Sequence, residues 1–255
     1  MIRYEVVDSV ATITIDDPDR RNPLSNAEMS ELGDAVRRSA TDPDVRVVVI
    51  TGAGDRAFSA GGDLASGFVD DPVAGHEGRG ALAGLFREMR RNPRPIVARV
   101  NGAALGGGFG VAAACDIVIA AEHARFGTPE INLGLWPMMI SAVLVRLAPR
   151  RALLEMMMLG SVISADEARD LGIVSRMVPA ADLDGEVALV VSQLKAKSSA
   201  ALALGKEAFY GMEDLDIDSA LDHLQVGLTA ASMTEDSVEG VKAFLAKREP
   251  LWKGR

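Results

Sequence analysis

The sequence predicts an α/β fold with parallel strand pairing, followed by a mostly helical C-terminal region. Strand-like and helix-like segments alternate up to about Ala148, a pattern typical of parallel sheets. Within that part, Val45–Thr51 is a β-branched run, which indicates a strand buried on both faces. Helical patterns dominate beyond Ala148. We therefore expect an α/β core over residues 1–195 and a helical oligomerisation region over residues 196–255.

Turn and capping signals divide the first half of the chain. The Asp8-Ser9 pair predicts a turn between two short strands. Ser25 and Glu28 have capping-box spacing, which predicts a helix from there to about Ser39. The strands expected in this half are Ile2–Val7, Val10–Asp16, Val45–Thr51, Ile96–Val100 and Asp116–Ala120.

The middle and the second half contain longer helical segments. Residues 65–77 mix Asp, Gly, Pro and His, so they predict a mobile loop, and a helix follows to about Arg91. Three or four helices are expected from Asp182 to the end. Between these parts the expected elements are the helices Arg150–Leu159 and Ser164–Leu171 and a last strand within Ile173–Val178.

One helical face in the last quarter carries apolar residues, among them Leu221, Leu224 and Leu228. Such a face packs either against the protein's own core or against a neighbouring subunit, and the pattern does not decide between the two.

Composition limits the classes of function. The 255 residues are 48% hydrophobic and carry a formal net charge of −9, which argues against nucleic acid as a partner. The single cysteine, Cys115, forms no intrachain disulfide and suits a reducing cytoplasm. We expect no membrane span, because no run of about 18 uncharged apolar residues occurs. The three histidines are scattered, so we expect no metal site.

The most informative stretch is NGAALGGGFG, Asn101–Gly110. It follows the apolar strand candidate Ile96–Val100 and precedes a small-residue helical pattern. A strand, a glycine turn and a helix start leave backbone N–H groups uncovered by side chains. Such donors suit a negative charge that develops on an oxygen atom.

A second small-residue turn lies upstream. The segment RAFSAGGDL, Arg56–Leu64, follows the Val45–Thr51 strand, and Ala60 lies among small residues. Two N–H groups from two separate turns can hold one oxygen between them, which is the geometry of an oxyanion hole. The alternative is that both segments are tight turns without a ligand.

Glu130 is a candidate acid/base group. It lies in FGTPEINLGLWP with Phe126, Ile131, Leu133 and Trp136 nearby in sequence. A carboxylate in apolar surroundings has a raised pKa, which suits proton transfer. A solvated surface glutamate is the alternative.

Ser59 offers a different chemistry. The sequence Ala57-Phe58-Ser59-Ala60-Gly61 is similar to a nucleophile elbow whose first glycine is replaced by alanine. A serine hydrolase built on Ser59 would need His123 or His223 as its base, and neither has an evident carboxylate partner.

Five segments together resemble the crotonase, or enoyl-CoA hydratase/isomerase, family over nearly the whole chain. They are ATITIDDPDRRNPLS, AFSAGGDL, VNGAALGGGFGVAAACD, FGTPEINLGLWP and ISADEARDLGIVSRMVP. The resemblance implies a spiral of ββα repeats with a C-terminal helical region, assembled as trimers or as hexamers of two trimers. It also implies an acyl-CoA thioester as substrate, with coenzyme A as part of that substrate and no separate cofactor.

The resemblance also implies roles for particular residues. The N–H groups of Ala60 and Gly107 would hold the thioester oxygen, and Glu130 would be the acid/base. Phe244 and Lys247 would reach the CoA of a neighbouring subunit. The remaining residues expected along the substrate are Arg20, Arg21, Leu24, Arg56, Gly61, Gly62, Asp63, Leu64 and Pro129.

Two departures from the family pattern bear on the reaction. Hydratases of the family carry a second glutamate where this chain has Gly110, and small glycine-rich sequence where it has Met138-Met139-Ile140-Ser141. A single carboxylate suits a proton shuttle, so the residues place double-bond isomerisation slightly ahead of hydration. Enoyl-CoA hydratase proper is the main alternative, and an acyl-CoA binder without catalysis is a third.

Overall fold

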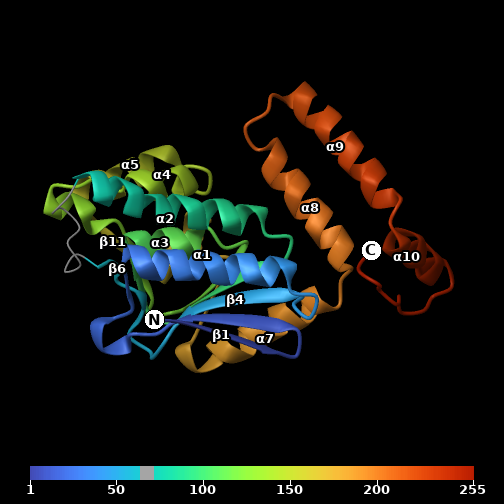
Figure 1. Ribbon diagram of the computed structural model, residues 1–255, viewed down its shortest axis with the longest axis horizontal. Helices are drawn as coiled ribbons and strands as arrows, with labels where there is room; N and C mark the ends of the chain where they lie inside the picture. The colour runs from blue at the N-terminus through green and yellow to red at the C-terminus, as the bar shows by residue number, and fades with distance from the viewer. Residues whose placement is uncertain (64–71) are drawn as a thin grey trace.

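The computed structural model describes residues 1–63 and 72–255, and its centre is a six-stranded sheet (Figure 1). The first two strands form an antiparallel hairpin, and every other neighbouring pair in the sheet is parallel. The predicted parallel pairing is therefore confirmed. In spatial order the strands are β1 (Ile2–Val7), β2 (Val10–Ile15), β4 (Val47–Gly52), β7 (Ile96–Val100), β9 (Ile117–Ala121) and β12 (Arg176–Val178).

Helices cover both faces of this sheet. The helices α1 (Asn26–Thr41) and α2 (Pro72–Arg91) pack on one face, and α7 (Leu183–Lys195) packs on the other (Figure 1). Alternate residues of β4 serve the two layers, since Val48 packs on the α1 side and Val49 on the α7 side. All residues of β4 are buried, as its β-branched run predicts.

Short strands continue the long ones into a second layer. After β4, β7 and β9 the chain runs directly into β5, β8 and β10, which join β11 in a four-stranded sheet. Each long-strand and short-strand pair is followed by a helix, so the ββα repeats implied by the resemblance are present. The added strands are β3 (Pro23–Leu24), β5 (Ala57–Ser59), β6 (Gly61–Gly62), β8 (Ala103–Leu105), β10 (Arg125–Gly127) and β11 (Val162–Ser164).

The starts of α1 and α2 differ in how well the sequence predicts them. The capping box of Ser25 and Glu28 is present at the start of α1. The expected loop over residues 65–77 is wrong for 72–77, because α2 already begins at Pro72, and proline is well suited to a first helical turn. Residues 64–71 lie outside the described part.

The remaining core elements are short helices. They are η1 (Pro18–Arg20), α3 (Gly107–Ala113), η3 (Pro129–Leu133), α4 (Met138–Leu144), α5 (Arg150–Leu159), α6 (Ala165–Asp170) and η4 (Ala180–Asp182).

The last helices extend away from the core, as Figure 1 shows. They are α8 (Ser199–Met212), α9 (Ile217–Ser232) and α10 (Glu235–Leu245). A half-buried polar cluster connects α8 to the core: Lys206 Nζ lies 2.7 Å from Asp116 Oδ2, and the Tyr210 hydroxyl donates to Asp116 Oδ1 at 2.8 Å.

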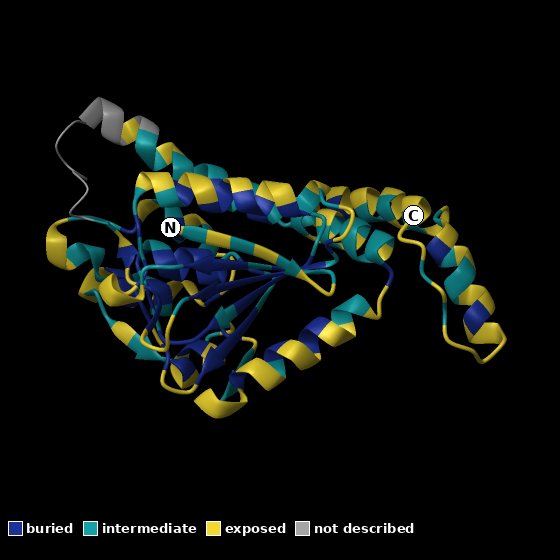
Figure 2. Ribbon diagram, turned by 60° about the horizontal axis from the view of Figure 1, so that its bottom comes forward, coloured by how far each residue is buried: buried dark blue, intermediate teal, exposed yellow. Residues whose placement is uncertain are grey.

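The tail helices α8–α10 are far more exposed than the core (Figure 2). Their exposed apolar side chains include Leu221, Val226, Leu228, Phe244 and Leu245. Oligomerisation through this region stays a prediction. Within the described ranges no single helix has the length and apolar composition to span a membrane, although Ala180–Lys195 and Ser199–Met212 pass that test as a pair bent by 101°.

Candidate active site

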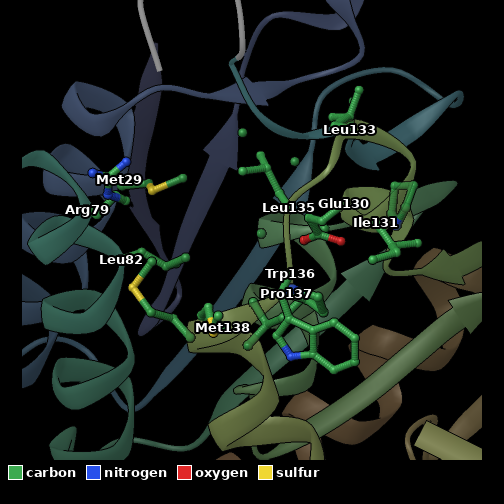
Figure 3. A pocket seen from close by; sticks show the side chains of 18 of the residues that line it. Met29, Arg79, Leu82, Glu130, Ile131, Leu133, Leu135, Trp136, Pro137 and Met138 are labelled. Carbon is green, nitrogen blue, oxygen red and sulfur yellow. The ribbon is translucent and has the colours of Figure 1, made fainter. Parts of the chain in front are cut away.

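A cavity of about 620 Å³ lies where both glycine turns, η3 and the start of α4 meet (Figure 3). Its walls are mostly apolar, with Met29, Leu82, Leu135 and Trp136 among the lining residues. Backbone of the two turns lines this cavity. Figure 3 shows the Glu130 carboxylate among the lining side chains.

The turn after β5 uses most of its N–H groups internally. Ala60 N–H donates to the Arg21 carbonyl at 2.9 Å, Gly61 N–H to Ser59 Oγ at 3.1 Å, and Asp63 N–H to the Leu24 carbonyl at 3.0 Å. The structure therefore corrects the assignment of Ala60 as an oxyanion donor, because its N–H already has an acceptor.

Gly62 is the better-placed donor of this turn. Successive N–H groups of a strand point to opposite edges, and Asp63 N–H points to β3, so Gly62 N–H points away from β3. Gly62 is exposed and lines the cavity. A Cβ placed on Gly107 would lie 3.9 Å from Gly62 N, so the two turns come together at this position.

The second turn is held in place by close backbone contacts. Gly106 has φ +52°, a conformation suited to glycine, and its N–H donates to the Gly127 carbonyl at 2.9 Å. Gly107 is the first residue of α3, where N–H groups have no partner within the helix. A Cβ on Gly108 would lie 2.5 Å from Ser59 Cβ, so glycine there allows the two turns to approach.

Glu130 places a carboxylate beside the second turn. Its Oε1 lies 3.0 Å from the position of a Cβ added to Gly106. Its Oε2 is buried and has no hydrogen-bond partner in the described structure. Burial raises the pKa of Glu130, while a backbone hydrogen bond opposes that shift more weakly. Among the described lining residues, Glu130 is the one carboxylate.

The structure leaves no room for a second carboxylate at residue 110. A Cβ added to Gly110 would overlap the Ile140 side chain and would lie 2.8 Å from Phe86 Cζ. Gly110 is therefore a packing position between α3, α4 and α2. The absence of a glutamate here is accompanied by apolar side chains that fill the space.

The other predicted binding residues lie in three places. Pro129 and Gly61 line the cavity, Leu24 is buried behind it, and Arg56 is exposed. Arg20 lies 2.8 Å from Asp63 in an ion pair, and Arg21 adopts φ +65° at the end of η1. Leu64 lies outside the described residues.

Phe244 and Lys247 are exposed at the end of the tail. They are not among the described residues that line this chain's cavity. Their expected contact is with the substrate of a neighbouring subunit, so it stays a prediction.

The hydrolase hypothesis finds no support in the geometry. Ser59 is fully buried, and its hydroxyl accepts from Gly61 N–H. The Nε2 atom of His123 lies 3.1 Å from the Asn101 carbonyl and 3.3 Å from the Asp55 carbonyl. Ser59 therefore supports the turn from behind and does not line the cavity in the described structure.

Sequence reasoning missed several lining residues. Met29 and Leu82 face the cavity from α1 and α2, and Arg79 lies near them (Figure 3). Their helical spacing indicates a buried face, but it does not say that a cavity interrupts the packing there.

The chain belongs to the enoyl-CoA hydratase/isomerase family, whose pattern matches residues 5–255. It is 34% identical to carnitinyl-CoA dehydratase of Escherichia coli K12 over 252 residues, covering 97% of this chain and 96% of that protein. It is 33% identical to the mitochondrial enoyl-CoA hydratase domain-containing protein 3 of Rattus norvegicus, covering 96% and 82%.

Solved structures of this family share the fold. An enoyl-CoA hydratase from Mycobacterium smegmatis superposes with a TM-score of 0.94 at 35% identity, covering 98% of each chain. Human enoyl-CoA hydratase domain-containing protein 3 gives a TM-score of 0.94 at 31% identity, covering 98% of this chain and 99% of that one. The crotonase-like α/β fold predicted from the sequence is confirmed.

Proposed function

We propose that this protein isomerises enoyl-CoA thioesters, with Glu130 as the single acid/base group. The observation that carries the proposal is one half-buried carboxylate in an apolar cavity, its Oε2 buried without a hydrogen-bond partner in the described structure, with the position of a second carboxylate filled by Ile140 and Phe86. One carboxylate can take up a proton and return it elsewhere on the same substrate.

The proposed reaction moves one proton and changes no net charge. The thioester oxygen of a 3-enoyl-CoA lies between the N–H groups of Gly62 and Gly107. Glu130 removes a proton from the α-carbon, and the electron pair of that C–H bond forms a dienolate with its charge on the thioester oxygen. Glu130 then returns the proton to the γ-carbon, which gives the 2-enoyl-CoA and regenerates the carboxylate.

The surroundings of each group suit its proposed role. The raised pKa makes Glu130 a stronger base than a solvated glutamate, and the apolar walls keep water from competing for the proton. Backbone donors strengthen their hydrogen bonds as the charge on the oxygen grows, which stabilises the transition state more than the substrate.

Coenzyme A enters as part of the substrate, and the proposed reaction needs no further cofactor and no metal. Near the first turn lie Arg20, Arg21 and Arg56. In this proposal their guanidinium groups bind the phosphates of coenzyme A. We further propose a trimer, or a hexamer of two trimers, in the cytoplasm. In that assembly Phe244 and Lys247 of a neighbour reach the bound CoA.

Hydration or dehydration is the second candidate, supported by the names of the relatives. One relative is named carnitinyl-CoA dehydratase, and one of the similar solved structures is an enoyl-CoA hydratase. In such a reaction Glu130 would have to serve both the water and the α-carbon.

The test offers purified protein a 3-enoyl-CoA and a 2-enoyl-CoA, with Glu130→Gln as the control. We expect wild type to consume the 3-enoyl-CoA much faster than it hydrates the 2-enoyl-CoA. Faster hydration would replace isomerisation by the second candidate. Tight acyl-CoA binding with no turnover of either would indicate a binding protein, and unchanged activity of Glu130→Gln would remove the role of Glu130.

A further inference from the structure

A second cavity of about 720 Å³ lies behind the first, among α2, α3, α4 and α8. Much of its lining is apolar, with Ala83, Phe86, Val143 and Phe209 among the residues. Among the described residues, Met139 alone lines both this cavity and the candidate active site.

Three side chains lie at the border of the two cavities: Met139 lines both, Ile140 lines the first and Phe86 lines the second. Met139 and Ile140 come from α4, and Phe86 comes from α2. Ile140 and Phe86 both approach Gly110 of α3, so these side chains meet where three helices converge. We call Phe86, Met139 and Ile140 the partition. Methionine is its adaptable member, because an unbranched thioether side chain changes rotamer readily.

Most charged groups around the second cavity are already paired, and Arg87, which also lines it, is exposed. Arg90 pairs with Glu213, Arg146 with Asp214 at 2.9 Å, and Lys206 with Asp116 at 2.7 Å. A polar ligand would have to compete with these ion pairs. An uncharged alkyl chain needs only the apolar surface that remains.

We propose that Met139 sets the acyl chain length this protein accepts, and that the second cavity is the subsite for the distal part of a longer chain. The inference rests on the proposed function, since the chain must enter through the candidate active site. Gly62, Gly107 and Glu130 hold the thioester end of the substrate. Met139 lies where a longer acyl chain would pass from the first cavity into the second.

The test measures binding of saturated butyryl-, octanoyl- and dodecanoyl-CoA by isothermal titration calorimetry, so that no turnover is needed. Each newly buried methylene tightens binding about fourfold. We expect Met139→Ala to bind dodecanoyl-CoA at least about tenfold more tightly than wild type does, with butyryl-CoA changed less than about twofold.

Two further variants make the result specific. Met138→Ala is the matched control, because Met138 lines the first cavity and is absent from the described lining of the second. It should leave the dependence on chain length as in wild type. Adding Ala83→Phe to Met139→Ala fills the second cavity and should cancel the gain for dodecanoyl-CoA.

The outcomes separate this inference from the proposed function. If all variants bind butyryl-CoA but Met139→Ala and Met138→Ala share one chain-length profile, Met139 is not the determinant and this inference fails alone. If Ala83→Phe does not cancel the gain, the chain lies elsewhere and the subsite assignment fails. If wild type binds no acyl-CoA of any length, the proposed function fails with it.

Discussion

The two sides of the candidate active-site cavity are built on different principles. On one side, the turns at Gly62 and Gly107 present backbone, and their close approach leaves no space for a side chain at Gly108. The other side presents side chains, with Glu130 from η3 and Met139 and Ile140 from α4. In the proposed function the backbone side fixes where an oxygen atom is held, while the side-chain side determines which proton moves and, as proposed for Met139, how long the acyl group can be.

This difference explains how one fold can support related reactions. In the proposed function, changing a side chain near Glu130 would alter the chemistry and leave the donors in place, because the turns are held by their own hydrogen bonds. Changing the turns removes the anchor that every reaction of a thioester enolate needs.

The largest expected effect comes from the side-chain side. Glu130→Gln keeps the shape of the side chain but removes the base, so we expect kcat to fall about 10²–10⁴-fold. The KM should change little, because the carboxylate does not hold the CoA. The measurement is steady-state kinetics on a 3-enoyl-CoA, and a change confined to KM would contradict the assignment.

The backbone side is tested by two neighbouring glycines. Gly61→Ala should lower kcat about 10²–10³-fold, since Gly61 has φ +94° and its added Cβ would lie 2.7 Å from the Leu105 carbonyl oxygen. Gly62→Ala is the matched control, because no atom lies within 4 Å of its added Cβ. Equal losses in both variants would show that the turn does not act through its backbone geometry.

The contact between the two sides is tested at Gly110. Gly110→Ala should lower the free energy of unfolding by about 1–3 kcal/mol, because its Cβ overlaps Ile140 and Phe86. Gly84→Ala in α2 meets no atom within 4 Å and should instead raise it by up to about 1 kcal/mol. Chemical denaturation measures the free energy of unfolding of both variants. A Gly110→Ala variant as stable as wild type would show that Ile140 and Phe86 can shift at little cost.

The smallest expected effect is the dependence of stability on pH. The folded-state pKa of Glu130 is raised above its value in the unfolded chain, so the folded state loses stability as pH rises through the interval between them. Glu130→Gln should therefore melt above wild type at pH 8, and the difference should vanish below about pH 4. A difference that persists in acid would mean that ionisation is not its cause.

The same titration should shape the rate of the wild-type enzyme. The base must be deprotonated, so kcat/KM for isomerisation should rise with pH through the raised pKa and then level off. A midpoint at or below the ordinary glutamate range would contradict a buried Glu130.

The sequence predicts the long strands well, because β-branched runs such as Val47–Gly52 carry a strong local signal. It does not predict β5 or β8, since strands of only three residues depend on their neighbours across the sheet. Glu130 was found from its apolar sequence neighbours. The burial of its Oε2 atom without a hydrogen-bond partner is visible only in three dimensions.

The donor in the first turn shows where sequence reasoning stops. RAFSAGGDL indicates that some N–H faces a ligand, but which one depends on the alternation of hydrogen bonds with β3. Ala60 and Gly62 have the same direction in a regular strand, and only the contacts of Arg21 and Leu24 distinguish them. The partition likewise joins residues from three helices that no local pattern connects.

The packing around Gly110 also restricts which mutational routes are open to this enzyme. A glutamate at residue 110 cannot enter by one substitution, because Ile140 and Phe86 must first give up the space. Shortening either of them beforehand leaves a void, which typically lowers stability by several kcal/mol before any new activity appears. A chain with this packing is therefore separated from one with a glutamate at residue 110 by a barrier of folding stability.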